Sequence, residues 1–257
     1  MRDGEPTEKT TAAESPYDRI AALYDSWSRS VTEDVDFYVA EARRATGAAG
    51  PPGDGRGQPI VELGVGIGRI AVPTAAAGVR VIGVDSSAGM LEVCRLRAEA
   101  AGVESLLDLR LGDLRDPPLD ERVPLVTCPF RSYLHLADAG ERLAALRAAR
   151  ELLIPGGRLI FDVFAPSADD IEDTHARWLE REPGIWERAD WDDRERRLTL
   201  TVRSDDAESS MTLAWLSPDE WRLLLEQAGF EVEACYGWFD RRPYAGGEDS
   251  IWIARRA

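Results

Sequence analysis

The chain has 257 residues, and its hydrophobic fraction of 44% is enough for a substantial core, which excludes a wholly disordered protein. Its 47 acidic and 31 basic side chains give a formal net charge of −16. This charge argues against a nucleic-acid partner and against an anionic membrane surface, because both require clustered basic residues.

The N-terminal part of the chain is predicted to be a tail followed by a helical lid. Residues 1–15 are polar and lack the apolar segment of a secretory signal, so we expect a flexible tail and a cytoplasmic protein without a membrane span. Apolar residues recur at helical spacing between positions 17 and 45, which predicts two helices interrupted near 28–32. A linker rich in Gly and Pro follows, and residues 16–57 are therefore expected to form the lid and its linker.

Strands and helices alternate over residues 58–165. The predicted strands are 60–63, 80–85, 106–111, 125–128 and 158–164, and the predicted helices are 67–77, 87–101 and 139–153. This alternation is typical of an α/β fold with a doubly wound, mostly parallel sheet.

The alternation stops at residues 166–216, which we predict to be a cap inserted after the fifth strand. The stretch 162–220 holds 17 acidic and 7 basic side chains, and a hairpin is expected from 197–203 and 210–216. We interpret the acidic charge as a solvated surface, with attraction of a cationic acceptor as the alternative. The tryptophans of this segment are expected to stack on a substrate, or to build a small satellite core or a homodimer interface.

The last part of the chain, residues 217–257, returns to the α/β pattern. Ser217 and Glu220 form a capping-box signature with Pro218 at the first helical position, which predicts a helix to residue 229. Two strands, 230–236 and 250–254, complete a sheet of seven. We therefore expect one α/β domain that carries a lid and a cap.

A glycine-rich loop, Gly-x-Gly-x-Gly, follows the first predicted strand of the sheet and starts at Gly64. Glycines in such a loop let a ligand approach the backbone closely, at the edge of the sheet where ligands bind. Arg69 occupies the position of the third glycine in a dinucleotide fingerprint, and Glu62 adds negative charge where a pyrophosphate would bind. Both residues disfavour a nicotinamide cofactor, and the carboxylate of Glu62 suits a ligand with an ammonium group.

With these residues the chain resembles the class I S-adenosylmethionine-dependent methyltransferases, whose Rossmann-like sheet has seven strands. The resemblance implies that Glu62 faces the cofactor's amino group, that Asp85 binds the ribose hydroxyls and that Met90, in Ser86-Ser87-Ala88-Gly89-Met90-Leu91, packs on the adenine. The implied cofactor-binding set is Tyr24, Glu62, Gly64, Gly66, Gly68, Arg69, Asp85, Ser86, Met90, Asp113, Leu114, Cys128 and Phe130.

The segment from Cys128 to Leu136 resembles the small-molecule branch of this family, in particular the glycine and amino-sugar N-methyltransferases. It departs from the family pattern at Val123-Pro124, where an acid usually begins the strand. Two Tyr-Asp pairs near the N-terminus, Tyr17-Asp18 and Tyr24-Asp25, resemble the lid helix of these enzymes. The substrate-binding residues predicted from these segments and the fifth strand are Tyr17, Arg131, Tyr133 and Phe164.

Two residues are candidates for catalysis in these segments. His135 titrates near neutrality in water, and Asp162 lies in the fifth strand, whose end borders the crevice. The alternatives are that His135 caps a helix or supports the pocket wall and that Asp162 makes a structural hydrogen bond. The three cysteines have no metal-binding spacing, and no metal is expected.

The predicted function is transfer of a methyl group to nitrogen or oxygen of a small-molecule metabolite by in-line displacement, a reaction in which proximity and alignment supply most of the rate. The alternatives are a non-catalytic cofactor-binding or interaction protein on the same fold and an NAD(P)-dependent oxidoreductase. A homodimer is one possible assembly.

Overall fold

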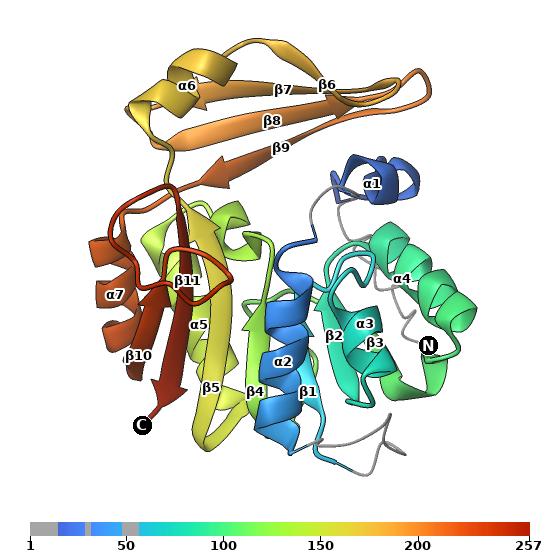
Figure 1. Cartoon of the computed structure of the whole chain (residues 1–257), viewed down its shortest axis with the longest axis vertical. Coiled ribbons are helices and arrows are strands. Elements are labelled where there is room, and N and C mark those ends of the chain that lie inside the picture. The colour runs from blue at the N-terminus through green and yellow to red at the C-terminus, as the bar shows by residue number, and fades with distance from the viewer. Residues whose placement is uncertain (1–14, 29–31, 48–56) are drawn as a thin grey trace, which may run out of the picture.

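The structure is a computed structural model that describes residues 15–28, 32–47 and 57–257 (Figure 1). The predicted tail, up to residue 14, and most of the predicted linker lie outside the described residues. So does part of the predicted interruption between the first two helices.

A seven-stranded sheet forms the centre of the molecule, in the order β10-β11-β5-β4-β1-β2-β3. Its strands are β1 (Ile60–Leu63), β2 (Val81–Asp85), β3 (Leu107–Leu111), β4 (Val123–Cys128), β5 (Leu153–Phe164), β10 (Phe230–Tyr236) and β11 (Asp249–Arg256). Strands β1 to β5 pair in parallel, and β11 joins β5 in the antiparallel direction. The predicted α/β class with a mostly parallel sheet is confirmed.

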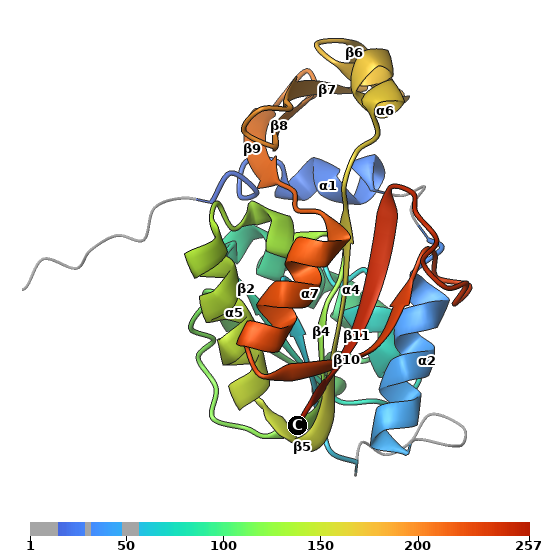
Figure 2. The same ribbon diagram turned by 90° about the vertical axis from the view of Figure 1, so that its left-hand side faces the viewer.

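Helices cover both faces of this sheet. They are α2 (Val35–Thr46), α3 (Ala71–Ala76), α4 (Ala88–Ala101), α5 (Ala139–Glu151) and α7 (Pro218–Gln227), with 3-10 turns η1 (Glu104–Leu106) and η2 (Ser132–His135). Figure 2 shows α5 and α7 on one side of the sheet and α2 on the other. The core includes an aromatic cluster in which Phe161 of β5 contacts the rings of Tyr133, Trp221 and Trp252. All four side chains are fully buried.

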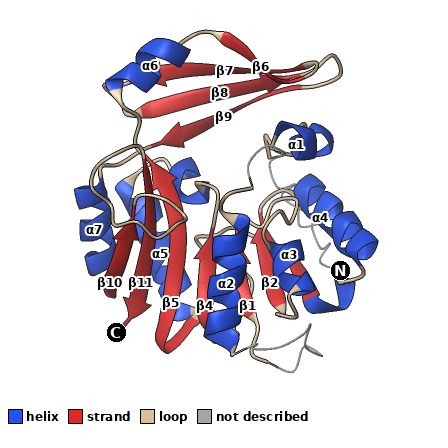
Figure 3. Cartoon of the chain, viewed as in Figure 1, coloured by secondary structure: helices blue, strands red, loops and turns tan. Residues whose placement is uncertain are grey.

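A second, four-stranded antiparallel sheet lies above the carboxyl ends of the parallel strands (Figure 3). It consists of β6 (Trp178–Glu182), β7 (Ile185–Asp192), β8 (Arg197–Arg203) and β9 (Glu208–Ala214), preceded by α6 (Ala168–Thr174). The predicted hairpin is β8 and β9, whose second strand begins two residues earlier than expected. The short helix α1 (Ala21–Trp27) lies between this cap and the main sheet (Figure 1).

Two predicted elements differ from those found. The helix expected from residue 67 begins only at Ala71, because Gly64, Gly66 and Gly68 have φ of 70°, 53° and 76°, outside the range of a right-handed helix. The fifth strand begins at Leu153 rather than residue 158, and its pairing register with β4 shifts between Val123 and Leu125. Residues 155–157, where Gly156 has φ of 77°, are therefore an irregularity within an extended segment.

Among the described residues, none of the helices is both long and apolar enough to span a bilayer. The same part of the chain contains no group of three His, Cys, Asp or Glu side chains arranged to hold a metal ion.

Candidate active site

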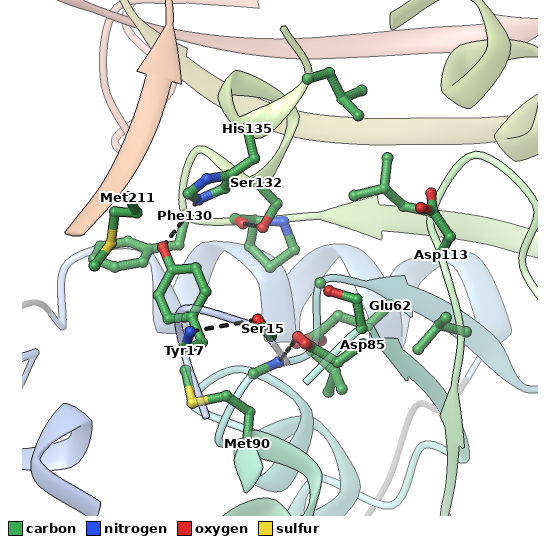
Figure 4. A pocket seen from close by; sticks show the side chains of 18 of the residues that line it. Ser15, Tyr17, Glu62, Asp85, Met90, Asp113, Phe130, Ser132, His135 and Met211 are labelled. Atoms are coloured by element: carbon green, nitrogen blue, oxygen red, sulfur yellow. Dashed lines mark hydrogen bonds between the residues drawn. The ribbon is translucent and has the colours of Figure 1, made fainter. Parts of the chain in front are cut away.

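A cavity of about 550 Å³ opens at the carboxyl ends of β1, β2 and β3, next to the glycine loop (Figure 4). Figure 4 shows Glu62 and Asp85 across the cavity from a group formed by Tyr17, Phe130, His135 and Met211. Eleven of the thirteen residues predicted to bind the cofactor line this cavity, namely Tyr24, Glu62, Gly64, Gly66, Arg69, Asp85, Ser86, Met90, Asp113, Leu114 and Phe130.

The two remaining residues, Gly68 and Cys128, line neither this cavity nor its neighbour. A Cβ at Gly68 would lie 2.5 Å from Cys94 Sγ, so this glycine allows the loop to pack on α4. Cys128 is fully buried at the end of β4. By contrast, a Cβ at Gly64 would lie 2.5 Å from Ser132 Oγ, so a glycine at this position allows Ser132 to pack directly against the loop.

Glu62 is a buried carboxyl group that lacks part of its hydrogen bonding. Its exposed fraction is 1%, and its Oε2 has no hydrogen-bond partner among the described residues. Burial raises the pKa of Glu62 to about 8, although nearby Arg69 acts to lower it. A buried carboxyl with one unpartnered oxygen at a cavity suits a cationic ligand group, and the amino group of S-adenosylmethionine meets this requirement.

Asp85, at the end of β2, organises the glycine loop and the start of α4. Its Oδ2 accepts a hydrogen bond from the Gly66 N–H at 2.8 Å, and its Oδ1 accepts one from the Ser87 N–H at 2.9 Å. A carboxylate has about four acceptor positions, so each oxygen keeps capacity for a ribose hydroxyl. Burial raises the pKa of this carboxyl above its usual value. The residues present therefore fit the cofactor that the fold family implies.

Arg69 links the glycine loop to the N-terminal end of α2. Its guanidinium forms a two-point ion pair with Asp34, with N–O distances of 2.5 and 2.6 Å, and lies 4.6 Å from the centre of the Phe130 ring. Asp34 is 1% exposed, so the pair is largely shielded from water. Arg69 lines the cavity while its charge is directed to Asp34.

A second cavity, of about 400 Å³, adjoins the first and reaches under the cap. Five residues line both cavities and so form a shared wall: Tyr17, Tyr24, Phe130, His135 and Met211. They come from the N-terminal segment, the loop after β4, η2 and β9. We call the first the cofactor cavity and the second the acceptor cavity.

His135 is held at the shared wall by the lid. Its Nε2 lies 2.9 Å from the Tyr17 hydroxyl. Burial lowers the pKa of His135 to about 4, so the ring is neutral at pH 7 and has one N–H. Nε2 and the Tyr17 hydroxyl therefore form one hydrogen bond, whose donor is set by the tautomer of the ring.

Asp162 lies at the acceptor cavity near the end of β5. It accepts hydrogen bonds from the Tyr38 hydroxyl at 2.6 Å and from the N–H groups of Phe130 and Arg131 at 2.9 and 3.2 Å. Burial raises the pKa of Asp162 to about 6, and these donors limit the rise.

The four residues predicted to bind substrate have different positions. Tyr17, Arg131 and Phe164 line the acceptor cavity, where the Arg131 guanidinium lies 4.5 Å from the centre of the Phe164 ring and 3.0 Å from Asp249. Tyr133 is fully buried in the aromatic core and lines neither cavity.

Sequence reasoning missed several residues of the acceptor cavity. They are Trp27, Trp238, Phe239, Met211, Glu187, Glu248 and Asp249. The periodicity of the first helix marked Trp27 as apolar, but no local motif marked the others. They come from the cap and from the loop between β10 and β11, which only the fold brings together.

Comparison with known proteins agrees with this geometry. Residues 60–157 match a methyltransferase domain family. The chain is 29% identical over 208 residues to the cypemycin N-terminal methyltransferase of a Streptomyces species, covering 73% of this chain and 78% of the relative. It is also 29% identical over 196 residues to the ubiquinone biosynthesis O-methyltransferase of Dinoroseobacter shibae, covering 70% of this chain and 62% of the relative.

The structure superimposes on the CcbJ methyltransferase of Streptomyces caelestis with a TM-score of 0.80 and 27% identity, covering 95% of this chain and 98% of the other. Fold, glycine loop and relatives together define an S-adenosylmethionine-dependent methyltransferase of the class I fold, as predicted.

Proposed function

We propose that this methyltransferase acts on a nitrogen atom of a small-molecule amine that binds in the acceptor cavity. The single observation that carries the proposal is the charge of that cavity. Its lining includes the acidic residues Glu33, Asp34, Asp162, Glu187, Glu248 and Asp249 and the basic residues Arg131 and Arg181. An excess of carboxylates favours a cationic ligand over a neutral or anionic one.

Most of this charge comes from outside the cap. Of the six acidic residues, Glu187 is the one that belongs to the cap strands, whereas the others come from the N-terminal segment, β5, the β10–β11 loop and the first residue of β11. Asp34 and Asp249 are paired with Arg69 and Arg131. The Glu248 side chain has no hydrogen bond or close ion pair among the described residues, and desolvation raises its pKa although the charge of Arg131 acts to lower it. Glu248 is therefore the candidate for binding an acceptor ammonium group.

Aromatic side chains supply the rest of the acceptor wall. Trp27, Phe164, Trp191, Trp238 and Phe239 line the cavity. Aromatic faces attract cations and also pack against the apolar body of a ligand. A cavity with both carboxylates and aromatic faces fits an amine carried on an apolar or ring-shaped body.

When bound, S-adenosylmethionine supplies a methyl group activated by its sulfonium. The protein's part is to align the acceptor at the shared wall and to exclude water. The Tyr24 hydroxyl has no hydrogen-bond partner among the described residues and lies at both cavities, so it is free to orient the acceptor. An ammonium group has no lone pair, so the acceptor must release a proton to water or to a carboxylate of the acceptor cavity before it reacts as the neutral amine.

The relatives themselves differ in target atom, since one is named an N-terminal methyltransferase and the other an O-methyltransferase. The test is therefore made with matched acceptors, in which one ring scaffold carries an amine, a hydroxyl or a carboxylate. We expect mass spectrometry to find one added methyl group on the amine member only. Equal or faster methylation of the hydroxyl member would refute the nitrogen assignment while leaving the methyltransferase activity intact.

The Glu248→Gln variant provides the second arm of the experiment. We expect it to raise the KM for the amine without changing the calorimetric affinity for S-adenosylmethionine, because Glu248 lines the acceptor cavity and not the cofactor cavity. Glu231→Gln, on the exposed surface of β10, is the matched control. An unchanged KM in Glu248→Gln would contradict the role of this carboxylate.

A further inference from the structure

We infer that Asp162 is a positioning residue, which builds the wall between the two cavities by holding Phe130 and Arg131 in a left-handed backbone conformation. This role applies whether nitrogen or oxygen is methylated, so it does not depend on the proposed target atom. It differs from the catalytic role that the sequence suggested for Asp162 and develops the alternative of a structural hydrogen bond.

The contacts of the carboxylate define the arrangement. Asp162 is 6% exposed, its Oδ1 accepts from the Phe130 N–H and the Tyr38 hydroxyl, and its Oδ2 accepts from the Arg131 N–H. Two consecutive backbone N–H groups thus converge on one side chain. Such a pair of N–H groups forms a small concave site for an anion, which here is part of the protein itself.

The backbone at this position requires such support. Phe130 has φ of 55° and Arg131 has φ of 65°, and neither is a glycine. Side chains with a Cβ are disfavoured in this region, and two in succession are rarer still. Conformations of this kind persist when the surrounding structure determines them, and Asp162 provides the hydrogen bonds that do so.

The held segment forms much of the shared wall. Phe130 lines both cavities, and its ring lies under the Arg69 guanidinium. Ser132, two residues after Phe130, lies so close to the glycine loop that it leaves no space for a Cβ at Gly64. A shift of this segment would therefore move the shared wall and would also displace the glycine loop.

The test uses variants that separate a positioning role from a base role. Asp162→Ala removes all three hydrogen bonds, and we expect kcat to fall by about 10²-fold because small misplacements at a reacting centre have effects of this size. Asp162→Asn keeps one acceptor oxygen, so we expect partial rescue of kcat. If Asp162 were a base, Asn would be as inactive as Ala, which would overturn the inference.

A second comparison stays informative even if Asp162→Ala does not fold. In the Asp162→Asn background, Arg131→Gly and Arg131→Ala both remove the Arg131 side chain, but only Gly adopts positive φ without strain. A positioning role predicts that the Gly double variant has a higher kcat than the Ala double variant. Equal kcat values in the two double variants would contradict it.

Hydrogen exchange gives a readout that needs no acceptor. We expect faster amide exchange in residues 129–134 of Asp162→Asn than in the wild type. Tyr38→Phe is the matched control, because it removes a donor to the same carboxylate without touching the two backbone N–H groups. Equal exchange in Asp162→Asn and the wild type would overturn the inference independently of the proposed amine substrate.

Discussion

At the scale of single residues, Glu62 shows a conflict between stability and binding. Its burial raises the pKa to about 8, above the value of the unfolded chain, so the folded state holds its proton more tightly. Ionisation of Glu62 therefore reduces the stability of the free protein as the pH rises from about 4.5 to about 8. A cationic ligand group reverses this effect, because it favours the ionised carboxylate.

Glu62→Gln is expected to weaken cofactor binding and to stabilise the free protein at pH 8. Loss of a charged hydrogen bond corresponds to about 1.5–3 kcal/mol, or about 10- to 100-fold in Kd. Calorimetric titration with S-adenosylmethionine should also show that wild-type affinity rises between pH 6.5 and 8 while the variant's affinity is flat. Glu41→Gln, a buried carboxyl outside both cavities, is the control. An unchanged Kd in Glu62→Gln would rule out this contact.

His135 has the opposite pH dependence. Its folded-state pKa, about 4, lies below that of the unfolded chain, so the unfolded state binds the proton first as the pH falls. The stability that comes from the neutral ring is present above about pH 6.5 and is lost as the pH falls toward 4.

His135→Gln should therefore reduce the loss of stability at acid pH. The measurement is the free energy of unfolding in urea between pH 4.5 and 7. The chain's second histidine, His175, provides a control with the same substitution on the cap side of the molecule. If His135→Gln and His175→Gln change the loss of stability at acid pH by the same amount, burial of His135 is not the cause of that loss.

At the scale of elements, the N-terminal lid is stabilised by polar contacts with the cap more than by its own helix. Helix α1 has seven residues and no side-chain cap at its start, so it is too short to be stable alone. Three hydrogen bonds join the lid to the cap or to η2, namely Ser209 Oγ to the Pro16 carbonyl at 2.7 Å, Trp27 Nε1 to Glu187 at 2.8 Å and Tyr17 to His135 at 2.9 Å.

Trp27→Phe is expected to loosen the lid, because Phe keeps an aromatic ring but lacks the indole N–H that donates to Glu187. Hydrogen exchange should become faster in residues 21–27, and the KM for the acceptor should rise, since Trp27 lines the acceptor cavity. Trp186→Phe, on β7 but outside both cavities, is the matched control. Unchanged exchange in Trp27→Phe would show that this contact does not hold the lid.

The elements also show where local patterns suffice. The positions of β1 and α4 follow from an apolar run and from Ser87 and Gly102 at the helix ends, and the structure has β1 at the predicted residues. The strands β6 and β7 were not predicted, because the Trp and Glu residues of this segment do not alternate regularly. β7 pairs with β6 on one side and with β8 on the other, and this pairing stabilises both strands.

At the scale of the whole molecule, the two cavities exist because three separate parts of the chain meet above one edge of the sheet. The glycine loop, the lid and the cap strand β9 all contribute to the cofactor cavity. A ligand bound there contacts all three parts, so it should stabilise the folded state as a unit.

S-adenosylmethionine at a free concentration of about 100 times its Kd is expected to raise the free energy of unfolding by about 2.7 kcal/mol. For a chain of this size that corresponds to a rise of about 5–10 °C in Tm. Differential scanning calorimetry measures it, and Asp85→Ala should show a smaller rise at the same cofactor concentration because the ribose hydroxyls lose their partner. No rise in the wild type would contradict the cofactor assignment.

The sequence by itself determined the parallel sheet and most of the cofactor cavity. These depend on short-range patterns, since the glycine loop, Glu62 and Asp85 each lie at the end of an apolar strand, and parallel strands bring their carboxyl ends together. The tertiary structure alone decided the acceptor cavity. Its charge and its aromatic wall come from segments more than 200 residues apart. The position of Tyr133 in the core depends on packing against Phe161 of β5 and Trp221 of α7, which no local spacing encodes.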